Sequence, residues 1–245
     1  MTDKKEIDEI VATPSKFRTP SKKIRRREDG SPCLPLNLNN PVKTIYMIRH
    51  GESQGQAATR NGLDRKSDLT LLDCDLTTKG QAEACGIQSF FSEQEMESIQ
   101  LVVSSPLTRA LHTALLGFPN KNILVQYDLR ELGSKAPENI PRDVEEVLAD
   151  LEISLSRRDE NVFLDVNSLK PSDWPRDYSP LVIKKDRIRK FFQWLYSDRE
   201  ENTVAVVCHY NVIRSAVIDS EKLKPKNAIP IRCSLYSNGE LMLWQ

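Results

Sequence analysis

The chain is poor in aromatic residues, has no excess of charge of either sign and contains no long hydrophobic run. Aromatic residues make up 7% of the 245 residues, and nothing in their arrangement resembles an array for stacking on bases. No apolar run approaches the about 20 residues that a membrane span needs. We therefore expect no nucleic-acid partner and no membrane partner. The 35 basic residues balance the 35 acidic ones, so net charge favours no partner of either sign.

Cysteine and histidine are also sparse, and their spacing argues against several common sites. The five cysteines are odd in number and none is spaced as Cys-x-x-Cys, which predicts free thiols in a reducing compartment. The three histidines, at positions 50, 112 and 209, lack the close spacing of zinc ligands. We expect no metal and no cofactor. The charged stretch 1–11 lacks the apolar centre of a secretory signal, so we expect a cytoplasmic protein.

A segment rich in proline and charge precedes the part that we expect to fold. Residues 1–41 contain few large apolar side chains, so their burial would offset little of the entropy lost on ordering. We predict a disordered tail here and a folded domain over residues 42–245. The basic run Lys22–Arg27 is typical of a solvated charged stretch. The alternative is a nuclear-import signal, which would add the nucleus to the expected location.

Short apolar runs alternate with helical patterns along the predicted domain. Four runs have the continuous apolar character of strands that are covered on both faces, and they span 44–48, 101–103, 123–125 and 203–207. An amphipathic helix is predicted ahead of the last run, with its apolar side at Ile188, Phe191, Phe192 and Leu195. The alternation predicts an α/β fold, a three-layer α/β/α sandwich with a mainly parallel central sheet.

Two helix starts are also predicted from capping signals. Thr77 is a good N-cap, and we expect its helix to turn four residues inward, Ala82, Cys85, Ser89 and Phe90. Ser105 followed by Pro106 predicts a second start, because proline at the first helical position loses no needed N–H group.

A hairpin is expected to close the domain. Residues 234–243 contain two short apolar segments on either side of Asn238–Gly239. This dipeptide favours a type I′ turn, in which both central residues have positive φ. The sequence therefore predicts a C-terminal hairpin that turns at these two residues.

Polar clusters directly follow each of the four predicted strands. They are Arg49–Ser53, Ser104–Arg109, Asp128–Glu131 and Cys208–Asn211. In an open α/β sheet, ligands bind at the edge where the carboxyl ends of parallel strands lie together. Because these segments are far apart in sequence, their shared position after strands predicts a functional site at that edge.

The residue types in these clusters suit the binding and transfer of phosphate. A phosphoryl group in transfer spreads negative charge over three oxygens, and arginine offers them a fixed fork of donors. Arg49 and Arg109 would supply two such forks. Neutral His50 is a competent nucleophile if a hydrogen bond fixes its tautomer, and the tight turn at Gly51 allows a backbone carbonyl to do so. His209 would add a further donor to the transferring oxygens.

The leaving alcohol of such a reaction needs a proton, and three glutamates compete to supply it. Glu131 is the best placed, since it comes soon after the third strand. Glu52 and Glu138 are the alternatives. His112 lies one helical turn beyond Arg109 and is interpreted as helix surface or as a residue behind the site.

These residues resemble a known family in their order and spacing. The matching segments are Arg49–Ser53, Leu76–Ala82, Ser105–Ala114, Leu129–Glu131 and His209. The chain resembles the histidine phosphatase superfamily, also called the phosphoglycerate mutase-like family, over about residues 43–245. The resemblance implies that His50 is the phosphorylated histidine and that Glu131 donates the proton. It also implies that Arg49, Arg109 and His209 form the phosphate pocket.

Three positions depart from the patterns of particular branches of this family. Gln56 stands where mutase-like members usually have asparagine, and it is a candidate for substrate contact. Residues 132–139 replace the tyrosine-glycine stretch that usually follows the acidic glutamate in true phosphoglycerate mutases. Tyr210 stands where the acid phosphatase and phytase branch usually has aspartate, which favours Glu131 as the acid.

We interpret the chain as a metal-independent phosphatase that hydrolyses a small phosphomonoester through a phosphohistidine on His50. One alternative is a phosphoglycerate-type mutase, against which the missing tyrosine-glycine stretch argues. The other is a non-catalytic protein of the same fold that binds a phosphorylated ligand. Residues 136–180 show no clear period and are interpreted as an insertion that covers the substrate. The sequence predicts no particular oligomeric state.

Overall fold

The computed structural model of the protein describes residues 42–132, 136–156, 163–166, 185–218 and 220–244. The predicted tail and its basic run lie outside the described residues, as does much of the predicted insertion. All four strands predicted from apolar runs are present, with ends that differ from the prediction by at most one residue.

A seven-stranded sheet in the order β4-β3-β2-β5-β1-β6-β7 forms the middle layer of the described domain. The pairs among the first five strands are parallel, and β6 and β7 are antiparallel additions at one edge. The strands are β1 Lys43–Arg49, β2 Leu101–Ser104, β3 Ile123–Val125, β4 Leu164–Asp165, β5 Thr203–Cys208, β6 Pro230–Leu235 and β7 Leu241–Leu243. The predicted, mainly parallel sheet is thereby confirmed.

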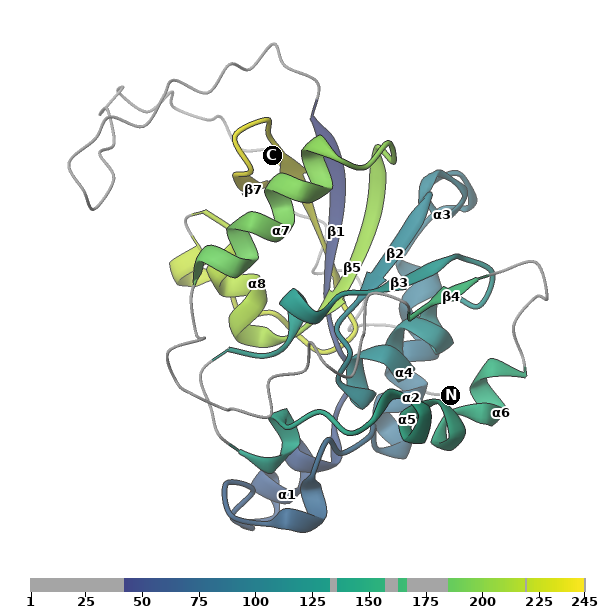
Figure 1. Cartoon of the computed structure of the whole chain (residues 1–245), viewed down its shortest axis with the longest axis vertical. Helices are drawn as coiled ribbons and strands as arrows, with labels where there is room; N and C mark the ends of the chain where they lie inside the picture. The colour runs from purple at the N-terminus through teal and green to yellow at the C-terminus, as the bar shows by residue number, and fades with distance from the viewer. Residues whose placement is uncertain (1–41, 133–135, 157–162, 167–184, 219, 245) are drawn as a thin grey trace, which may run out of the picture. The chain divides into compact units, whose positions relative to one another are not determined.

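Helices cover both faces of this sheet, as Figure 1 shows. One face carries α7 Lys185–Ser197 and α8 Tyr210–Ala216, and the other carries α2 Thr78–Cys85 and α4 Thr108–Gly117. The remaining helices are α1 Gln54–Arg60, α3 Glu93–Ser98, α5 Val144–Asp150 and α6 Glu152–Leu155. Short 3-10 helices are η1 Leu69–Leu71, η2 Gly86–Phe90, η3 Tyr127–Leu129, η4 Pro137–Asn139 and η7 Ser220–Lys222.

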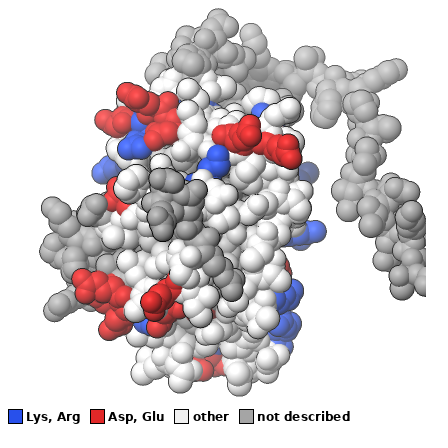
Figure 2. Space-filling view, turned by 90° about the vertical axis from the view of Figure 1, so that its right-hand side faces the viewer, with Lys and Arg blue, Asp and Glu red and all other residues white. Residues whose placement is uncertain are grey.

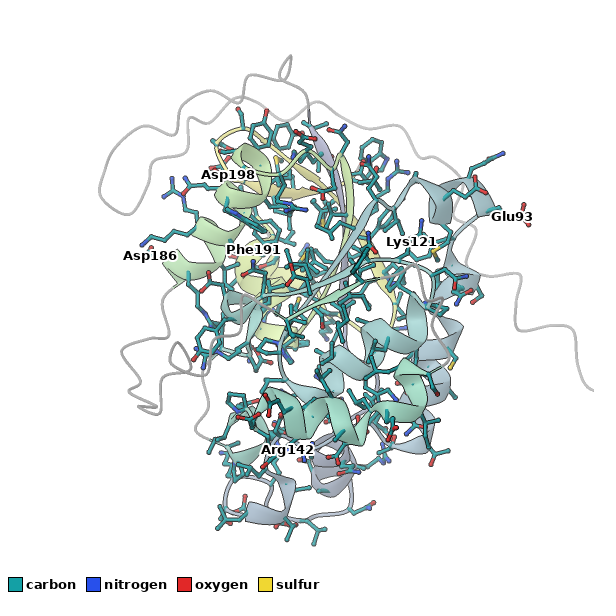
Figure 3. The ribbon with its side chains drawn as sticks, turned by 45° about the vertical axis from the view of Figure 1, so that its right-hand side comes forward. Glu93, Lys121, Arg142, Asp186, Phe191 and Asp198 are labelled. Carbon is teal, nitrogen blue, oxygen red and sulfur yellow. The ribbon has the colours of Figure 1, made fainter. Side chains whose placement is uncertain are left out.

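Two hydrophobic cores lie between the three layers, because side chains alternate across each strand. On β1, Ile45 and Met47 pack toward α7 and α8, while Tyr46 and Ile48 pack toward α4. The predicted apolar stripe of α7 is buried in the first core, and Figure 3 shows its Phe191. The predicted three-layer arrangement is therefore confirmed. The apolar run of β1 lacks polar residues because both faces of the strand are covered.

The inward face of α2 differs from the prediction. Thr77 caps the helix as expected, its hydroxyl accepting the Gly80 N–H at 3.0 Å. However, Gly80, Ala84 and Ile87 face inward, whereas the four residues predicted to do so are exposed. The expectation failed because two of the three inward residues are small, and because the chain leaves α-helical geometry at Gly86.

The closing hairpin is present, but its turn differs from the prediction. Only Gly239 of the Asn238–Gly239 pair has positive φ, at 77°. The Gly239 N–H donates to the Tyr236 carbonyl at 2.9 Å, so Ser237 and Asn238 are the central residues of the turn. Glycine thus follows the turn in left-handed geometry, an arrangement typical of three-residue hairpin loops and not of type I′ turns.

Charged side chains do not gather into one field on the face drawn in Figure 2. Acidic and basic residues form small separate groups there, with uncharged residues between them. Within the described ranges, no helix is both long enough and apolar enough to cross a bilayer.

Candidate functional site

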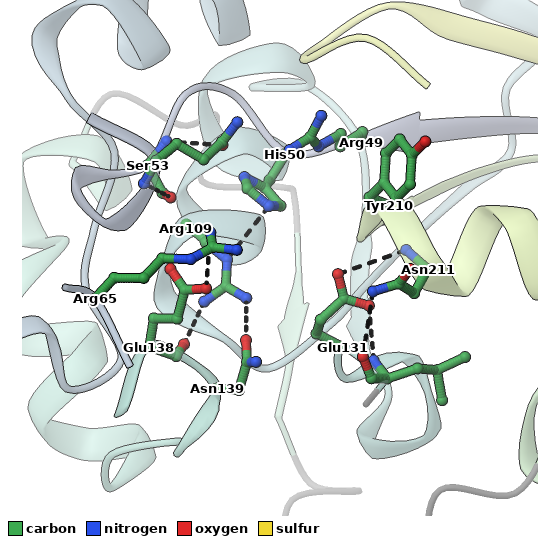
Figure 4. Close-up of a pocket in the computed structure, with 12 residues that line it drawn as sticks. Arg49, His50, Ser53, Arg65, Arg109, Glu131, Glu138, Asn139, Tyr210 and Asn211 are labelled. Atoms are coloured by element: carbon green, nitrogen blue, oxygen red, sulfur yellow. Dashed lines mark hydrogen bonds and ion pairs between the residues drawn. The ribbon is translucent and has the colours of Figure 1, made fainter. Parts of the chain in front are cut away.

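A pocket lies at the edge where β1 and β5 end, and it brings together five residues predicted for the site. Its volume is about 180 Å³, and 12 residues line it (Figure 4). The five predicted residues among them are Arg49, His50, Gln56, Arg109 and Glu131. The sixth, His209, lies directly beside the pocket, with its ring centre 5.2 Å from that of His50.

His50 follows β1 directly and is held as the neutral tautomer that carries its proton on Nδ1. That nitrogen lies 2.7 Å from the Gly51 carbonyl oxygen, to which it donates. The Nε–H of Arg109 points at Nε2 of His50 from 3.3 Å, which requires a free lone pair on Nε2. Burial, together with the positive charges of Arg109 and Arg49, holds the pKa of His50 well below its usual value. The ring therefore presents an unprotonated nitrogen to the pocket.

The turn after His50 depends on a close contact between two glycines. A Cβ atom on Gly51 would lie 2.3 Å from the Gly80 carbonyl oxygen. A Cβ atom on Gly80 would lie 2.1 Å from the Glu52 carbonyl oxygen. Both distances are far below van der Waals contact, so only glycine allows the start of α2 to lie against the His50 turn.

Arg109 is almost completely buried, at 2% exposure, and each of its guanidinium nitrogens has a partner. Besides the contact with His50, one amino group donates to the Glu138 carbonyl and the other to Asn139 Oδ1, at 2.8 Å. Glu138 and Asn139 belong to η4, far along the chain from α4. No pattern in the sequence indicated this partnership, which fixes the direction of the guanidinium.

The helix that carries Arg109 begins two residues later than predicted. α4 starts at Thr108, and Ser105 and Pro106 lie ahead of it. The buried Asp73 carboxylate accepts the Thr108 N–H at 2.9 Å and the Thr108 hydroxyl at 2.8 Å. A side chain from another segment thus does the capping that Ser105 was expected to do.

Ser105 instead orients His209, which is fully buried. The Ser105 oxygen accepts the Leu107 N–H at 3.3 Å and lies 2.7 Å from Nε2 of His209. Nδ1 of His209 has no hydrogen-bond partner among the described residues. Burial and the nearby Arg109 charge hold the pKa of His209 well below its usual value. His209 can therefore donate one hydrogen bond as a neutral ring.

Arg49 and Gln56 line the same pocket from β1 and α1. Arg49 donates to the Pro225 carbonyl at 3.2 Å, and its guanidinium lies 5.2 Å from the centre of the Tyr210 ring. Gln56 exchanges two hydrogen bonds with Asn227, at 3.0 and 3.2 Å, so much of its amide is already occupied. Asn227 also donates to the His50 carbonyl at 2.7 Å, which links Gln56 to the His50 turn.

The three competing glutamates occupy different environments. Glu131 lines the pocket opposite Arg65 and Glu138 (Figure 4), and burial raises its pKa. Glu52 does not line the pocket: it is bonded to Arg60 and Lys79, and these hydrogen bonds lower its pKa to about 2. Glu138 lines the pocket but forms an ion pair with Arg65, with N and O 3.2 Å apart. The geometry favours Glu131 as a proton donor.

Several lining residues were not predicted for the site. They are Ser53, Arg65, Leu132, Asn139, Tyr210 and Asn211. Arg65, Leu132 and Asn139 lie on loops or on a short 3-10 helix that carry no periodic signal, so no pattern in the sequence pointed to them. Ser53, Tyr210 and Asn211 could have been found, because they belong to the polar clusters that follow the first and the fourth predicted strands.

His112 is buried, with 6% exposure, so the helix-surface interpretation was wrong and the alternative placement behind the site describes it better. Its Nδ1 lies 2.9 Å from Asp75 Oδ1, and its Nε2 lies 2.9 Å from the Ser154 hydroxyl. It thus links α4 to α6. Among the described residues, no group of three or more His, Cys, Asp or Glu side chains could hold a metal ion.

Comparison with known proteins assigns the chain to a family. Residues 45–242 match the histidine phosphatase superfamily, branch 1, and the chain belongs to that superfamily. A Schizosaccharomyces pombe protein described as a "probable phosphatase" is 34% identical over 76 residues, which are 31% of this chain. The match spans 32% of that relative, about a third of its length.

Two solved structures show the shared fold. The alpha-ribazole phosphatase of Shigella flexneri has a TM-score of 0.52 at 19% identity, over 82% of this chain and 94% of that one. A phosphoserine phosphatase mutant of Entamoeba histolytica has a TM-score of 0.51 at 17% identity, over 82% and 95%. At these identities, the likeness extends to the fold alone.

Proposed function

We propose that the protein is a metal-independent phosphatase that hydrolyses a small phosphomonoester through a phosphohistidine on His50. The observation that carries the proposal is the unprotonated Nε2 of His50, which faces a pocket that Arg49 and Arg109 also line (Figure 4). A phosphate dianion in this pocket would meet two cations and a nucleophile together. Membership of the histidine phosphatase superfamily and the S. pombe relative support an enzyme of this class.

In the first step, Nε2 of His50 attacks phosphorus from the side opposite the leaving oxygen. The N–P bond forms as the bond from phosphorus to the leaving oxygen breaks, and Glu131 gives its proton to that oxygen. The imidazole becomes positively charged, and its Nδ1–H keeps the hydrogen bond to the Gly51 carbonyl. The raised pKa of Glu131, caused by burial, favours the protonated form that this step needs.

In the second step, water attacks phosphorus and the ionised Glu131 accepts its proton. The electrons of the N–P bond return to Nε2 of His50, and inorganic phosphate is released. In both steps the guanidinium groups of Arg49 and Arg109 stabilise the charge on the three remaining oxygens. Nδ1 of His209 has no partner among the described residues, and in the proposed mechanism it carries the ring proton and donates to one of these oxygens.

The predicted insertion, residues 136–180, is proposed to cover the substrate. Its described part supplies Glu138 and Asn139 to the pocket. Two contacts fix this part to the domain: Asp73 accepts the Arg142 N–H at 3.2 Å, and His112 bonds Ser154 at 2.9 Å. The base of the insertion is therefore held beside the pocket.

Trapping the intermediate tests the nucleophile. Brief mixing with a radiolabelled phosphomonoester and an alkaline quench should leave label on the protein that is stable in base and lost in acid. His50→Ala should abolish the label and lower kcat by about 10³-fold or more. His112→Gln, a matched change of a histidine outside the pocket, should keep the label. Label that persists in His50→Ala would place the nucleophile elsewhere.

The same preparation separates the proposal from its alternatives. Hydrolysis of an aryl phosphate should continue with excess chelator, and loss of activity with rescue by a divalent metal would contradict a metal-independent mechanism. A mutase would convert 3-phosphoglycerate into 2-phosphoglycerate without net release of phosphate, as read by NMR. A binding protein would take up phosphate or vanadate without turning over any ester.

A further inference from the structure

The pocket contains a carboxylate that phosphate transfer does not require. Glu138 is 7% exposed and lines the pocket, with its side chain beside the guanidinium groups of Arg65 and Arg109 (Figure 4). It is packed closely, since a Cβ atom on Gly55 would lie 2.0 Å from Glu138 Oε2. A fixed negative charge weakens the binding of a phosphate dianion, and burying a carboxylate is costly. Its place in the pocket therefore points to a role toward another part of the substrate.

The charges that line the pocket already balance a phosphate monoester. Arg49, Arg65 and Arg109 carry three positive charges, Glu138 carries one negative charge, and Glu131 is neutral in the protonated state that an acid needs. His50 is neutral because its Nε2 accepts a hydrogen bond. The described lining thus has two net positive charges, which match the about two negative charges of a phosphate monoester. A further carboxylate or phosphate on the substrate would remain uncompensated.

The rest of the lining suits hydroxyl groups. Five neutral side chains able to form hydrogen bonds line it, Ser53, Gln56, Asn139, Tyr210 and Asn211, whereas Leu132 is the one aliphatic residue among the described lining. A buried carboxylate accepts hydrogen bonds and can bind a hydroxyl donor, whereas it repels another anion.

We propose that the substrate is a phosphomonoester of an uncharged, hydroxyl-bearing alcohol, and that Glu138 determines this specificity. Its carboxylate accepts a hydrogen bond from a hydroxyl of the leaving group and excludes leaving groups that carry a second anion. Arg65 holds the carboxylate in place through the 3.2 Å ion pair. This inference rests on the proposed phosphatase function.

Two substrates with the same carbon skeleton test the inference. Glycerol 3-phosphate carries a hydroxymethyl group where 3-phosphoglycerate carries a carboxylate. The unchanged protein should hydrolyse glycerol 3-phosphate with a kcat/KM at least about tenfold higher than its kcat/KM for 3-phosphoglycerate. Glu138→Gln removes the repulsion of the substrate carboxylate and frees Arg65, so it should raise kcat/KM for 3-phosphoglycerate. The ratio of kcat/KM for glycerol 3-phosphate to kcat/KM for 3-phosphoglycerate should therefore fall by about tenfold. The ratio is taken within each variant, so the fraction of active protein cancels.

Two further variants sharpen the test. Glu93→Gln removes the same charge from the exposed surface of α3, at the edge of the domain in Figure 3, and should leave the ratio unchanged. Arg65→Gln removes a positive charge from the pocket and should raise the ratio. A preference of the unchanged protein for 3-phosphoglycerate, or an unchanged ratio in Glu138→Gln, would overturn the inference. Aryl phosphate hydrolysis in the same preparations reports on the phosphatase proposal separately.

Discussion

The floor and the rim of the pocket are built differently. We define the floor as His50 and Arg109, together with His209 directly beside the pocket; the three are 4%, 2% and 0% exposed. We define the rim as Arg65 and Tyr210, which are partly exposed. Each floor side chain is bonded to a residue from a different segment of the chain. The side chain of Arg65 is 39% exposed and has one ion-pair partner. The contacts between segments fix the floor, as the proposed charge stabilisation in a transition state requires, while the rim has more freedom to adapt to the proposed leaving group.

The largest expected difference between floor and rim concerns two arginines. Arg109→Ala should lower kcat/KM for an aryl phosphate by about 10²–10³-fold, because it removes a preorganised charge stabiliser. Arg65→Ala should cost less than about tenfold on the same substrate, since the residue lies at the rim and its charge is partly screened by solvent. Steady-state kinetics of both variants measures the difference. Equal losses would show that Arg65 belongs functionally to the floor.

The pH dependence should report on Glu131 and His50 together. Deprotonation removes the proposed acid, so kcat/KM for an alkyl phosphate should fall by about tenfold per pH unit above the raised pKa of Glu131. Protonation of His50 removes the nucleophile, but its pKa is well below 6.5, so the acidic limb should lie below the usual histidine range. Glu131→Gln should lose the basic limb. A profile that keeps this limb in the variant would assign it to another group.

The smallest effect is expected at Glu52, whose contacts with Arg60 and Lys79 lie outside the pocket. Its pKa is lowered to about 2, so its contribution to stability is present above the unfolded value near 4.5 and is lost as pH falls toward 2. Both partners are more than half exposed, which limits the contribution to about 1 kcal/mol or less. Denaturant unfolding of the unchanged protein and Glu52→Gln should differ at pH 7 and converge near pH 2. A constant difference would contradict the assignment.

The sequence was sufficient to predict the sheet and to group its candidate site residues. The apolar runs of β1 and β5 have no polar face, because both sides of these strands are buried. This continuous apolar character allowed the strands to be recognised in the sequence. The rule that parallel strands present their carboxyl ends together then placed His50 and His209 at one edge. Both inferences depend on local pattern and on a general property of α/β sheets.

The partners of Arg109 could not be predicted in the same way. Glu138 and Asn139 belong to η4, which a hydrogen bond holds near Arg109. In this bond the backbone N–H of Asp73 donates to the Pro137 carbonyl at 3.1 Å, and the two segments are distant in sequence. No periodicity encodes such a contact. The capping of α4 by Asp73 was missed for the same reason, since a nearby serine and proline gave a plausible but incorrect local start.

The contact between Gly51 and Gly80 limits how this domain can change in evolution. Each glycine lies where a single methyl group would overlap a backbone oxygen, at 2.3 and 2.1 Å, so neither position has a neutral substitution. Moving either backbone to make room would displace the His50 turn or the start of α2. Replacement of one glycine cannot be compensated by changing the side chain at the other position, because the atoms that a new Cβ would overlap are main-chain oxygens in both cases. Mutational scanning for function should therefore find these two positions intolerant of every replacement, including alanine, even though neither residue lines the pocket.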